Sequence, residues 1–576
     1  MAYFALALAF QIPFFQEYLK IQNRHLPAWD PALHAKDGLM FYLQALRLDV
    51  LSLFYTLINL SFWMPLHPIL IAITSVFFPF NLDAYVFLNS IVLSLGLAGA
   101  SFLFWRSQRP KLLQKTVFSL GSFYSLLRLS NSLAFRQTHY HVMIESLALG
   151  LTMMFFTSWM LEDESNEEYL FYSRWTNVFL SLLFFTKIQY GLFFGLAYLT
   201  KHLLTHWKEL VSEEGCLSAL KREWIQKRWL VLISGIFLIA SPALAFSGNR
   251  ADAICFLGFA IVLILSFTPI ARKKAPVTLQ FFIRFTAIPF GWFYLFPIKN
   301  KVRFLLYNSD STISGEPLLQ KLQVLIADFG LFFGMNRYWA TFAILSSFLI
   351  AWGIRFIMRV QINWSLRSIL LAALLFYLPM TFLVSTRQVR FAITWAILFP
   401  WIGIFILSEL SRWKIGAFAI SLTLMVGIVQ ERLKLPPFQA PYEPVATGFL
   451  DPKRKTLNFV LENFDFKRPG IIYGLGKNMD QAIPLLELIA LRSHPEYSNV
   501  LLKREDRALV FNDFGKQGNQ DPAGVILKRA NNSELKQIVL YPEGFEYLDF
   551  KKVSAGLLQQ GFKAVLQNGE ILFLTR

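Results

Sequence analysis

Long apolar runs separated by short polar segments dominate the first three quarters of this chain. The runs are roughly 17–22 residues long, the length a helix needs to cross about 30 Å of hydrocarbon. The pattern therefore predicts an all-α polytopic membrane protein with about thirteen transmembrane helices. The predicted spans are residues 2–17, 84–105, 116–135, 142–161, 175–187, 189–205, 229–247, 252–270, 278–297, 337–357, 367–385, 391–409 and 414–430.

Composition and charge agree with this prediction. Hydrophobic residues make up 55% of the 576 residues and charged residues only 16%, which is too apolar for one soluble core. The net charge of +18 does not indicate nucleic-acid binding, because the basic residues lie between apolar spans. The two cysteines, Cys216 and Cys255, are too few for a disulfide framework.

The positive-inside rule gives the chain a direction. With the N-terminus inside, even-numbered spans end in the cytoplasm, and most basic clusters then fall on that side. The first run begins at Met1 without a cationic segment or a small-residue cleavage site, which predicts a retained first helix. The acidic loop 162–168 is the exception, and we expect it to be solvated.

Two regions differ from the spans. The first outer loop, residues 18–83, is too apolar for a free loop, and we expect interfacial helices over 41–60 and 68–80. A proline-rich linker, residues 436–452, separates the membrane domain (1–435) from a predicted soluble α/β domain (453–576). Within that domain the pattern predicts strands at 471–473, 508–511, 524–527 and 537–540, helices at 480–491 and 550–560, and a hairpin turn at Asn568-Gly569.

Candidate chemistry lies in the first outer loop. Asp30, His34 and Asp37 are spaced i, i+4 and i+7, so a helix would place them on one face. An acid–histidine–acid face suits a general base or a metal site. It is also what an interfacial helix with a water-facing polar side would show. The spacing leaves both interpretations open.

Five short motifs share an order along the chain with a known family. The sequence resembles the GT-C superfamily of polytopic glycosyltransferases, in the branch of protein O-mannosyltransferases and lipid A aminoarabinose transferases. The resemblance covers most of residues 1–410. The motifs are Trp29-Asp30-x-Ala32-x-His34, Trp63-Met64-Pro65-Leu66-His67-Pro68, Met143-Ile144-Glu145, Phe185-Thr186-Lys187-Ile188-Gln189-Tyr190-Gly191 and Arg387-Gln388-Val389-Arg390-Phe391.

The resemblance implies transfer of a sugar from a polyprenyl-phosphate donor to a glycan, lipid or protein acceptor. The reaction would take place at the periplasmic face of a bacterial inner membrane, with inversion and with Asp30 as general base. Arg387, Arg390 and Lys187 would bind the donor phosphate, unless the arginines simply snorkel to headgroups and the lysine reaches open water. Further substrate-binding candidates are His34, Asp37, His67, His139, His141, Glu145, Gln189 and Tyr190.

One departure from the family pattern concerns metal binding. Many relatives have Asp-Glu where this chain has Asp30-Pro31. Without the second carboxylate, a divalent metal bridged by that pair is not expected, and no cofactor is implied. The change also leaves room for a non-catalytic homologue. A lipid-linked sugar flippase or transporter would share the polytopic pattern, and so would an O-antigen polymerase-like or ligase-like enzyme.

Overall fold

The computed structural model describes most of residues 2–20, 30–58, 65–200, 393–433 and 522–576, with short gaps. It also describes short stretches between 463 and 495 and the single positions 323, 327 and 338. The predicted spans between 229 and 385 lie outside the described residues, apart from position 338. The same is true of the linker 436–452 and of the predicted strand 508–511.

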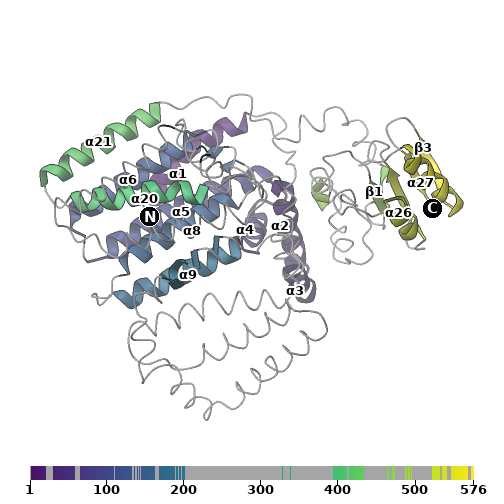
Figure 1. The fold of residues 1–576 in the computed structure, drawn as a ribbon, viewed down its shortest axis with the longest axis horizontal. Helices are drawn as coiled ribbons and strands as arrows, with labels where there is room; N and C mark the ends of the chain where they lie inside the picture. Colours follow the sequence, from purple (N-terminus) through teal and green to yellow (C-terminus); the bar gives the residue numbers. More distant parts are fainter. Residues whose placement is uncertain are drawn as a thin grey trace, which may run out of the picture.

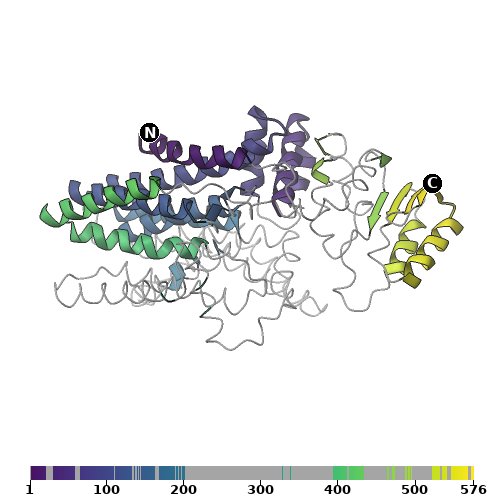
Figure 2. The same cartoon turned by 90° about the horizontal axis from the view of Figure 1, so that it is seen from above.

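Seven helices overlap predicted spans, with bounds that differ by up to six residues, and lie side by side in one bundle (Figures 1 and 2). Among the described residues, α5 and α21 are long and apolar enough to cross a membrane by length and composition. The total of thirteen spans stays a prediction. The seven helices are α1 (Ala2–Leu19), α5 (Leu82–Arg106), α6 (Leu112–Ser130), α8 (Glu145–Leu161), α9 (Tyr169–Thr186), α20 (Ile393–Leu410) and α21 (Lys414–Leu433).

Side-chain contacts show that α1 and α6 run in the same direction. The Tyr3 hydroxyl donates to the Ser119 carbonyl at 2.8 Å, and the Gln11 amide donates to Ser130 Oγ at 3.2 Å. Tyr3 precedes Gln11 in α1, and their partners Ser119 and Ser130 come in the same order in α6. This is the relative direction that the predicted topology requires of the first and third spans.

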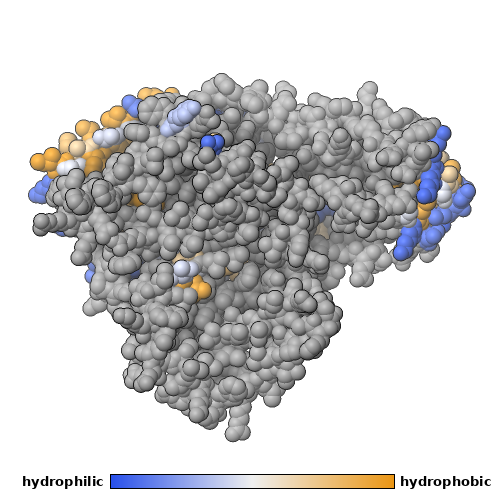
Figure 3. All heavy atoms as spheres, viewed as in Figure 1, coloured by the Kyte–Doolittle hydropathy of each residue, from blue (hydrophilic) through white to orange (hydrophobic). Residues whose placement is uncertain are grey.

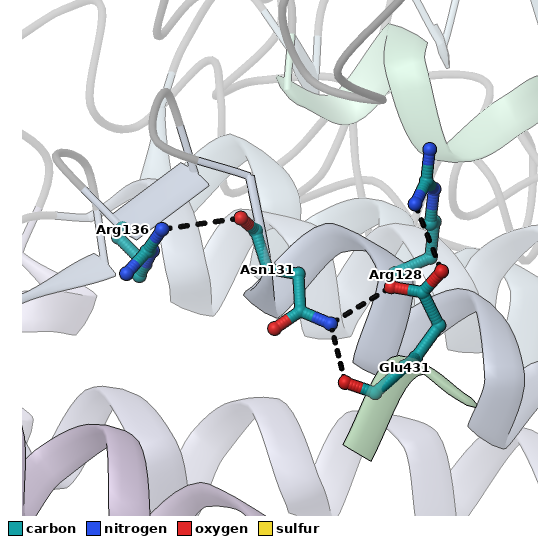
Figure 4. Close-up of polar contacts among 4 residues, drawn as sticks. All are labelled: Arg128, Asn131, Arg136 and Glu431. Atoms are coloured by element: carbon teal, nitrogen blue, oxygen red, sulfur yellow. Dashed lines mark hydrogen bonds and ion pairs between the residues drawn. The ribbon is translucent and has the colours of Figure 1, made fainter. Parts of the chain in front are cut away.

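A polar network joins the last turns of α6 and α21 (Figure 4). The Arg128 guanidinium donates to Glu431 Oε1 at 2.8 Å, and the Asn131 amide donates to Glu431 Oε2 and to its backbone oxygen, each at 2.8 Å. Arg136 in turn donates to the Asn131 backbone oxygen at 3.2 Å. The third and thirteenth predicted spans thus end on the same side of the bundle, as predicted.

Glycines and aromatic rings form the centre of the bundle. A Cβ atom on Gly96 of α5 would overlap the backbone of Gly150 in α8, so these two helices touch through their backbones. At the α20 contact, the Trp401 indole N–H donates to Thr157 Oγ1 at 3.0 Å. A bulkier residue at Gly96 would push α5 and α8 apart.

An exposed apolar surface follows α21, which Figure 3 shows as an orange strip at the upper left. Ile415 is 86% exposed, Phe418 70% and Leu433 80%. A water-soluble protein rarely exposes such a continuous apolar strip. Such a strip is what a lipid-facing helix would show, because hydrocarbon chains do not penalise an apolar surface.

One prediction about the polar loops is wrong. Glu162, expected in a solvated loop, is only 2% exposed and is the C-cap of α8. The Tyr198 hydroxyl contacts both Glu162 carboxylate oxygens, at 2.8 and 3.1 Å. Burial is tolerated because the charge is hydrogen-bonded. Residues 163–167 of that loop lie outside the described residues.

The first outer loop contains three helices with boundaries that differ from those predicted. They are α2 (Asp30–Leu46), α3 (Val50–Ile58) and α4 (Leu66–Phe77). The predicted helix over 41–60 is divided by a turn at Leu48, whose φ of 53° ends α2 in the left-handed conformation. With 12 residues, or about 18 Å, α4 is too short to span the bilayer.

The C-terminal elements form a four-stranded mixed sheet with two helices (Figure 1). The strand order is β1-β2-β4-β3, with β1 and β2 parallel and the other pairs antiparallel. The strands predicted at 471–473 and 537–540 are confirmed, and β3 and β4 flank the predicted hairpin turn. The elements are β1 (Gly470–Tyr473), α26 (Pro522–Ala530), β2 (Gln537–Leu540), α27 (Tyr547–Gln559), β3 (Lys563–Gln567) and β4 (Leu572–Thr575).

The strand predicted over 524–527 is wrong, because these residues belong to α26. A short apolar run does not by itself distinguish a strand from a buried helical segment. Pro522 favours the helix, since proline suits the first helical turn. Ile526 and Ala530, four residues apart, are both fully buried, as expected on one face of a helix.

Candidate functional site

The helix α2 places the acid–histidine–acid motif at its N-terminal end. It begins at Asp30, and Pro31 is tolerated because the first turn needs no amide donor there. His34 is 1% exposed and Asp37 is 5% exposed. The interpretation in which this side of the helix faces water is therefore wrong for these two residues. The Asp30 side chain lies outside the described residues.

His34 meets a second histidine on α4. The rings of His34 and His67 lie edge to face with centroids 5.1 Å apart. Gly38, one turn after His34, makes this approach possible, because a Cβ atom there would overlap the Ile71 side chain of α4. The glycine thus holds together the two helices that contribute the histidines.

His67 is buried in an unusual state. It is 1% exposed, and neither ring nitrogen has a hydrogen-bond partner among the described residues. Burial lowers the pKa of His67 to about 4, an effect that the nearby Glu145 carboxylate partly opposes. The imidazole is therefore neutral at physiological pH. It offers a ligand one N–H donor and one nitrogen acceptor.

Glu145 forms a buried ion pair with Lys187. The Lys187 ammonium lies 3.0 Å from Glu145 Oε1, and the two side chains are 2% and 1% exposed. Glu145 is the first residue of α8, and Lys187 is the C-cap of α9. The ammonium also lies 5.2 Å from the centre of the Tyr190 ring. A buried lysine needs an anionic partner, and Glu145 provides one.

These contacts connect four of the five sequence motifs. His34, His67, Glu145, Lys187 and Tyr190, here called the His34–Lys187 cluster, come from the first, second, third and fourth motifs in turn. All five side chains are almost fully buried. Motifs spread over more than 150 residues of sequence therefore meet at one end of the bundle. The fifth motif lies outside the described residues.

His139, which is not part of this cluster, makes polar contacts with its own set of partners. Its Nε2 lies 3.0 Å from Ser90 Oγ and its Nδ1 2.8 Å from Ser146 Oγ. Its backbone oxygen accepts from Asn89 at 2.7 Å. Burial lowers the pKa of His139 to about 3, so the ring is neutral. With both ring nitrogens engaged, His139 fixes the chain just before Glu145.

Asp37 belongs to a further group that sequence reasoning did not identify. Its Oδ1 lies 3.9 Å from the Lys36 ammonium, which lies 2.6 Å from Glu487 Oε2 in the C-terminal part of the chain. No local pattern indicates this contact, because Lys36 and Glu487 are 451 positions apart. Among the described residues, no three His, Cys, Asp or Glu side chains gather closely enough to hold a metal ion.

Several candidates lie outside the described residues, and the roles of all the candidates stay predictions. Those outside the described residues are His141, Gln189, Arg387 and Arg390, together with the side chain of Asp30.

Comparison with known proteins gives structural neighbours only. No family model and no curated protein matches the chain. Similar solved structures include ArnT from Cupriavidus metallidurans bound to undecaprenyl phosphate, at 10% identity and a TM-score of 0.47, covering 100% of this chain and 97% of that one. Another is the Archaeoglobus fulgidus oligosaccharyltransferase AglB in complex with an inhibitory peptide and a dolichol-phosphate, at 13% identity and a TM-score of 0.45, covering 99% and 74%. Both belong to the superfamily that the sequence resembles. At these identities and TM-scores, the likeness assigns no role to any residue.

Proposed function

We propose that this chain is a membrane glycosyltransferase that moves a sugar from a polyprenyl-phosphate donor to an acceptor hydroxyl. The acceptor belongs to a glycan, a lipid or a protein. The reaction takes place beside the His34–Lys187 cluster, on the periplasmic face of a bacterial inner membrane. Residues 453–576 form a domain on the same face.

The convergence of the motifs carries this proposal. Four segments that individually resemble glycosyltransferase motifs contribute side chains to one buried cluster. A buried lysine, a carboxylate and two histidines are costly to keep away from water unless they serve a purpose there. Active sites are the places where such groups gather.

The reaction needs a base at the acceptor. In the proposed mechanism, the Asp30 carboxylate takes the proton of the acceptor hydroxyl while its oxygen attacks the anomeric carbon. The bond between that carbon and the phosphate oxygen breaks, and the phosphate leaves with the electron pair. A single direct displacement inverts the anomeric configuration. Asp30 lies one helical turn before His34, which supports this placement.

The leaving phosphate needs a cation. A sugar-linked polyprenyl phosphate is a diester with one negative charge, and the released monoester gains further charge. The Lys187 ammonium, held at 3.0 Å by Glu145, is a preorganised cation for this developing charge. Arg387 and Arg390 are proposed to complete the phosphate site, since their guanidinium groups match phosphate oxygens in geometry. Neutral His67 is proposed to hydrogen-bond the sugar or phosphate.

The position of the cluster favours an enzyme over a transporter. Transporters bind their substrates near the bilayer midplane. Here the polar groups lie at helix ends: His67 in the first turn of α4, Glu145 at the start of α8 and Lys187 at the end of α9. Groups at helix ends lie near the membrane surface, where a lipid-linked donor presents its phosphate.

The test is turnover of radiolabelled polyprenyl-phosphate sugars by the Asp30→Asn variant. We expect a loss of roughly 2–4 decades in rate, the usual scale for a positioned base. The matched control is Asp49→Asn, because Asp49 is exposed and its Oδ1 only caps α3, accepting from the Ser52 amide at 3.0 Å. Asparagine caps a helix equally well, so this control should keep full activity. Turnover by Asp30→Asn close to that of the control would remove Asp30 as the base.

A further inference from the structure

The helix that begins at Asp30 is attached to the C-terminal part of the chain by an ion pair. The Lys36 ammonium lies 2.6 Å from Glu487 Oε2, and each side chain is only 11% exposed. Residues 487–489 and 491–492 are helical. The contact is therefore short, largely shielded from water, and formed between two helical stretches.

Further contacts accompany the ion pair. Near the other end of α2, the Arg47 guanidinium donates to the Pro495 carbonyl at 3.2 Å. Leu488 is 1% exposed and Leu491 is fully buried. Both belong to the apolar cluster that also contains Leu39 of α2. The described residues of this segment (487–489, 491–492 and 495), here called the segment 487–495, thus lie beside α2 through charged, polar and apolar contacts.

We infer that the segment 487–495 is a positioning element for α2, and that the Lys36–Glu487 ion pair fixes the helix whose first residue is the proposed base. This inference rests on the proposed function, because it concerns the placement of Asp30. Lys36 follows Asp30 by six residues, or about 9 Å along the helix axis. A shift of α2 at Lys36 is therefore transmitted to Asp30 by a rigid helical segment.

Asp37 determines where the Lys36 ammonium moves when the charge of Glu487 is lost. Lys36 lies 2.6 Å from Glu487 but 3.9 Å from Asp37 Oδ1. With Glu487 neutralised, Asp37 is the nearest carboxylate to Lys36 among the described residues, and the ammonium turns toward it. The change rearranges the face of α2 that carries His34. A misplacement of about 1 Å costs on the order of 10²-fold in rate.

The experiment uses the full-length protein and measures sugar transfer at varied donor concentrations. We expect Glu487→Gln and Lys36→Met each to lower kcat by on the order of 10²-fold, with little change in the donor KM. The double variant should be no worse than either single one, because both remove the same interaction. Lys36→Arg keeps the charge and should retain most of the activity. Lys20→Met is the control, because the Lys20–Glu17 pair is exposed.

Thermal unfolding of the same variants separates this inference from the proposed function. Non-additive unfolding midpoints for Lys36→Met and Glu487→Gln would support the ion pair even if the wild-type protein transferred no sugar. In that case the proposed function would fail, and the ion pair would stand only as a contact that fixes α2. Unchanged kcat in both single variants of an active enzyme, or additive losses in the double variant, would overturn the inference while leaving the proposed function intact. A rise in KM without a fall in kcat would also overturn it.

Discussion

Breaking the buried ion pair between Glu145 and Lys187 should destabilise the protein strongly, and breaking it from both sides should not. The perturbations are Glu145→Gln, Lys187→Met and the double variant. Each single variant leaves one charge buried without its counterion, whereas the double variant leaves none. The single and double variants should differ in stability because both side chains are at least 98% buried, so water does not reach a charge that has lost its counterion.

The geometry sets the size of the effect. At the observed 3.0 Å, Coulomb's law with an effective dielectric constant of about 20 gives about 5.5 kcal/mol of attraction. Removing one partner of a buried pair typically costs 3–5 kcal/mol, while replacing both with neutral groups is close to neutral. We therefore expect each single variant to lose about 3–5 kcal/mol and the double variant to lose less than either.

The assay is reversible unfolding of the full-length protein in mixed micelles, analysed as a double-mutant cycle. The exposed pair Glu17–Lys20, whose side chains are 30% and 70% exposed, is the matched control and should contribute less than about 1 kcal/mol. Additive losses at Glu145 and Lys187, or losses as small as those of the control, would refute the reasoning. Lys187 would then be hydrated rather than paired in a dry site.

Further predictions concern other parts of the fold. The pKa of His67 is lowered by burial from 6.5 to about 4, so the unfolded chain takes up a proton before the native protein does. His67 should therefore reduce stability as the pH falls from 6.5 to 4, by at most about 3.4 kcal/mol, and His67→Gln should flatten that part of the pH–stability curve. Gly38→Ala should separate α2 from α4 and lower both stability and sugar transfer. The control Gly403→Ala should lower neither, because no atom lies within 4 Å of the added carbon. Unfolding and turnover measured on both variants check this. Glu431→Ala should lower the unfolding midpoint because it leaves the Arg128 guanidinium and the Asn131 amide without their shared acceptor, and circular dichroism on heating measures it. Protease added to right-side-out vesicles should cleave the chain after residue 453; cleavage only in inside-out vesicles would contradict the proposed orientation.

The positions of the helices could be predicted because the hydrocarbon thickness fixes the length of a span. Each of the seven described spans overlaps its predicted apolar run, and the contacts between α6 and α21 agree with the predicted directions. The same reasoning failed where length was uninformative. The short run 524–527 suited a strand or a helix equally, and it is helical.

Burial of polar groups was harder to predict than the elements themselves. The spacing of His34 and Asp37 allowed either a water-facing or a buried side, and only packing against α4 decided it. Glu162 was assigned to water because its neighbours are acidic. Its burial depends on Tyr198, which lies 36 positions later and is brought close only by the fold.

The contacts that define the candidate site join residues far apart in sequence. Glu145 and Lys187 are 42 positions apart, and Lys36 and Glu487 are 451 apart. Periodicity describes which residues share one element, not which elements meet. The motifs identified Glu145 and Lys187 separately, but their ion pair became visible only in the structure. Nothing in the sequence around Glu487 indicated its contact with α2.

The central claim is that the His34–Lys187 cluster serves sugar transfer from a polyprenyl-phosphate donor. The most direct measurement incubates the purified protein with a set of polyprenyl-phosphate sugars and follows the release of free polyprenyl phosphate. We predict release with at least one sugar, nearly abolished by Asp30→Asn and unaffected by Asp49→Asn. Release that is equal in all three proteins, or no release with any sugar from a folded protein and a suitable acceptor, would contradict the claim.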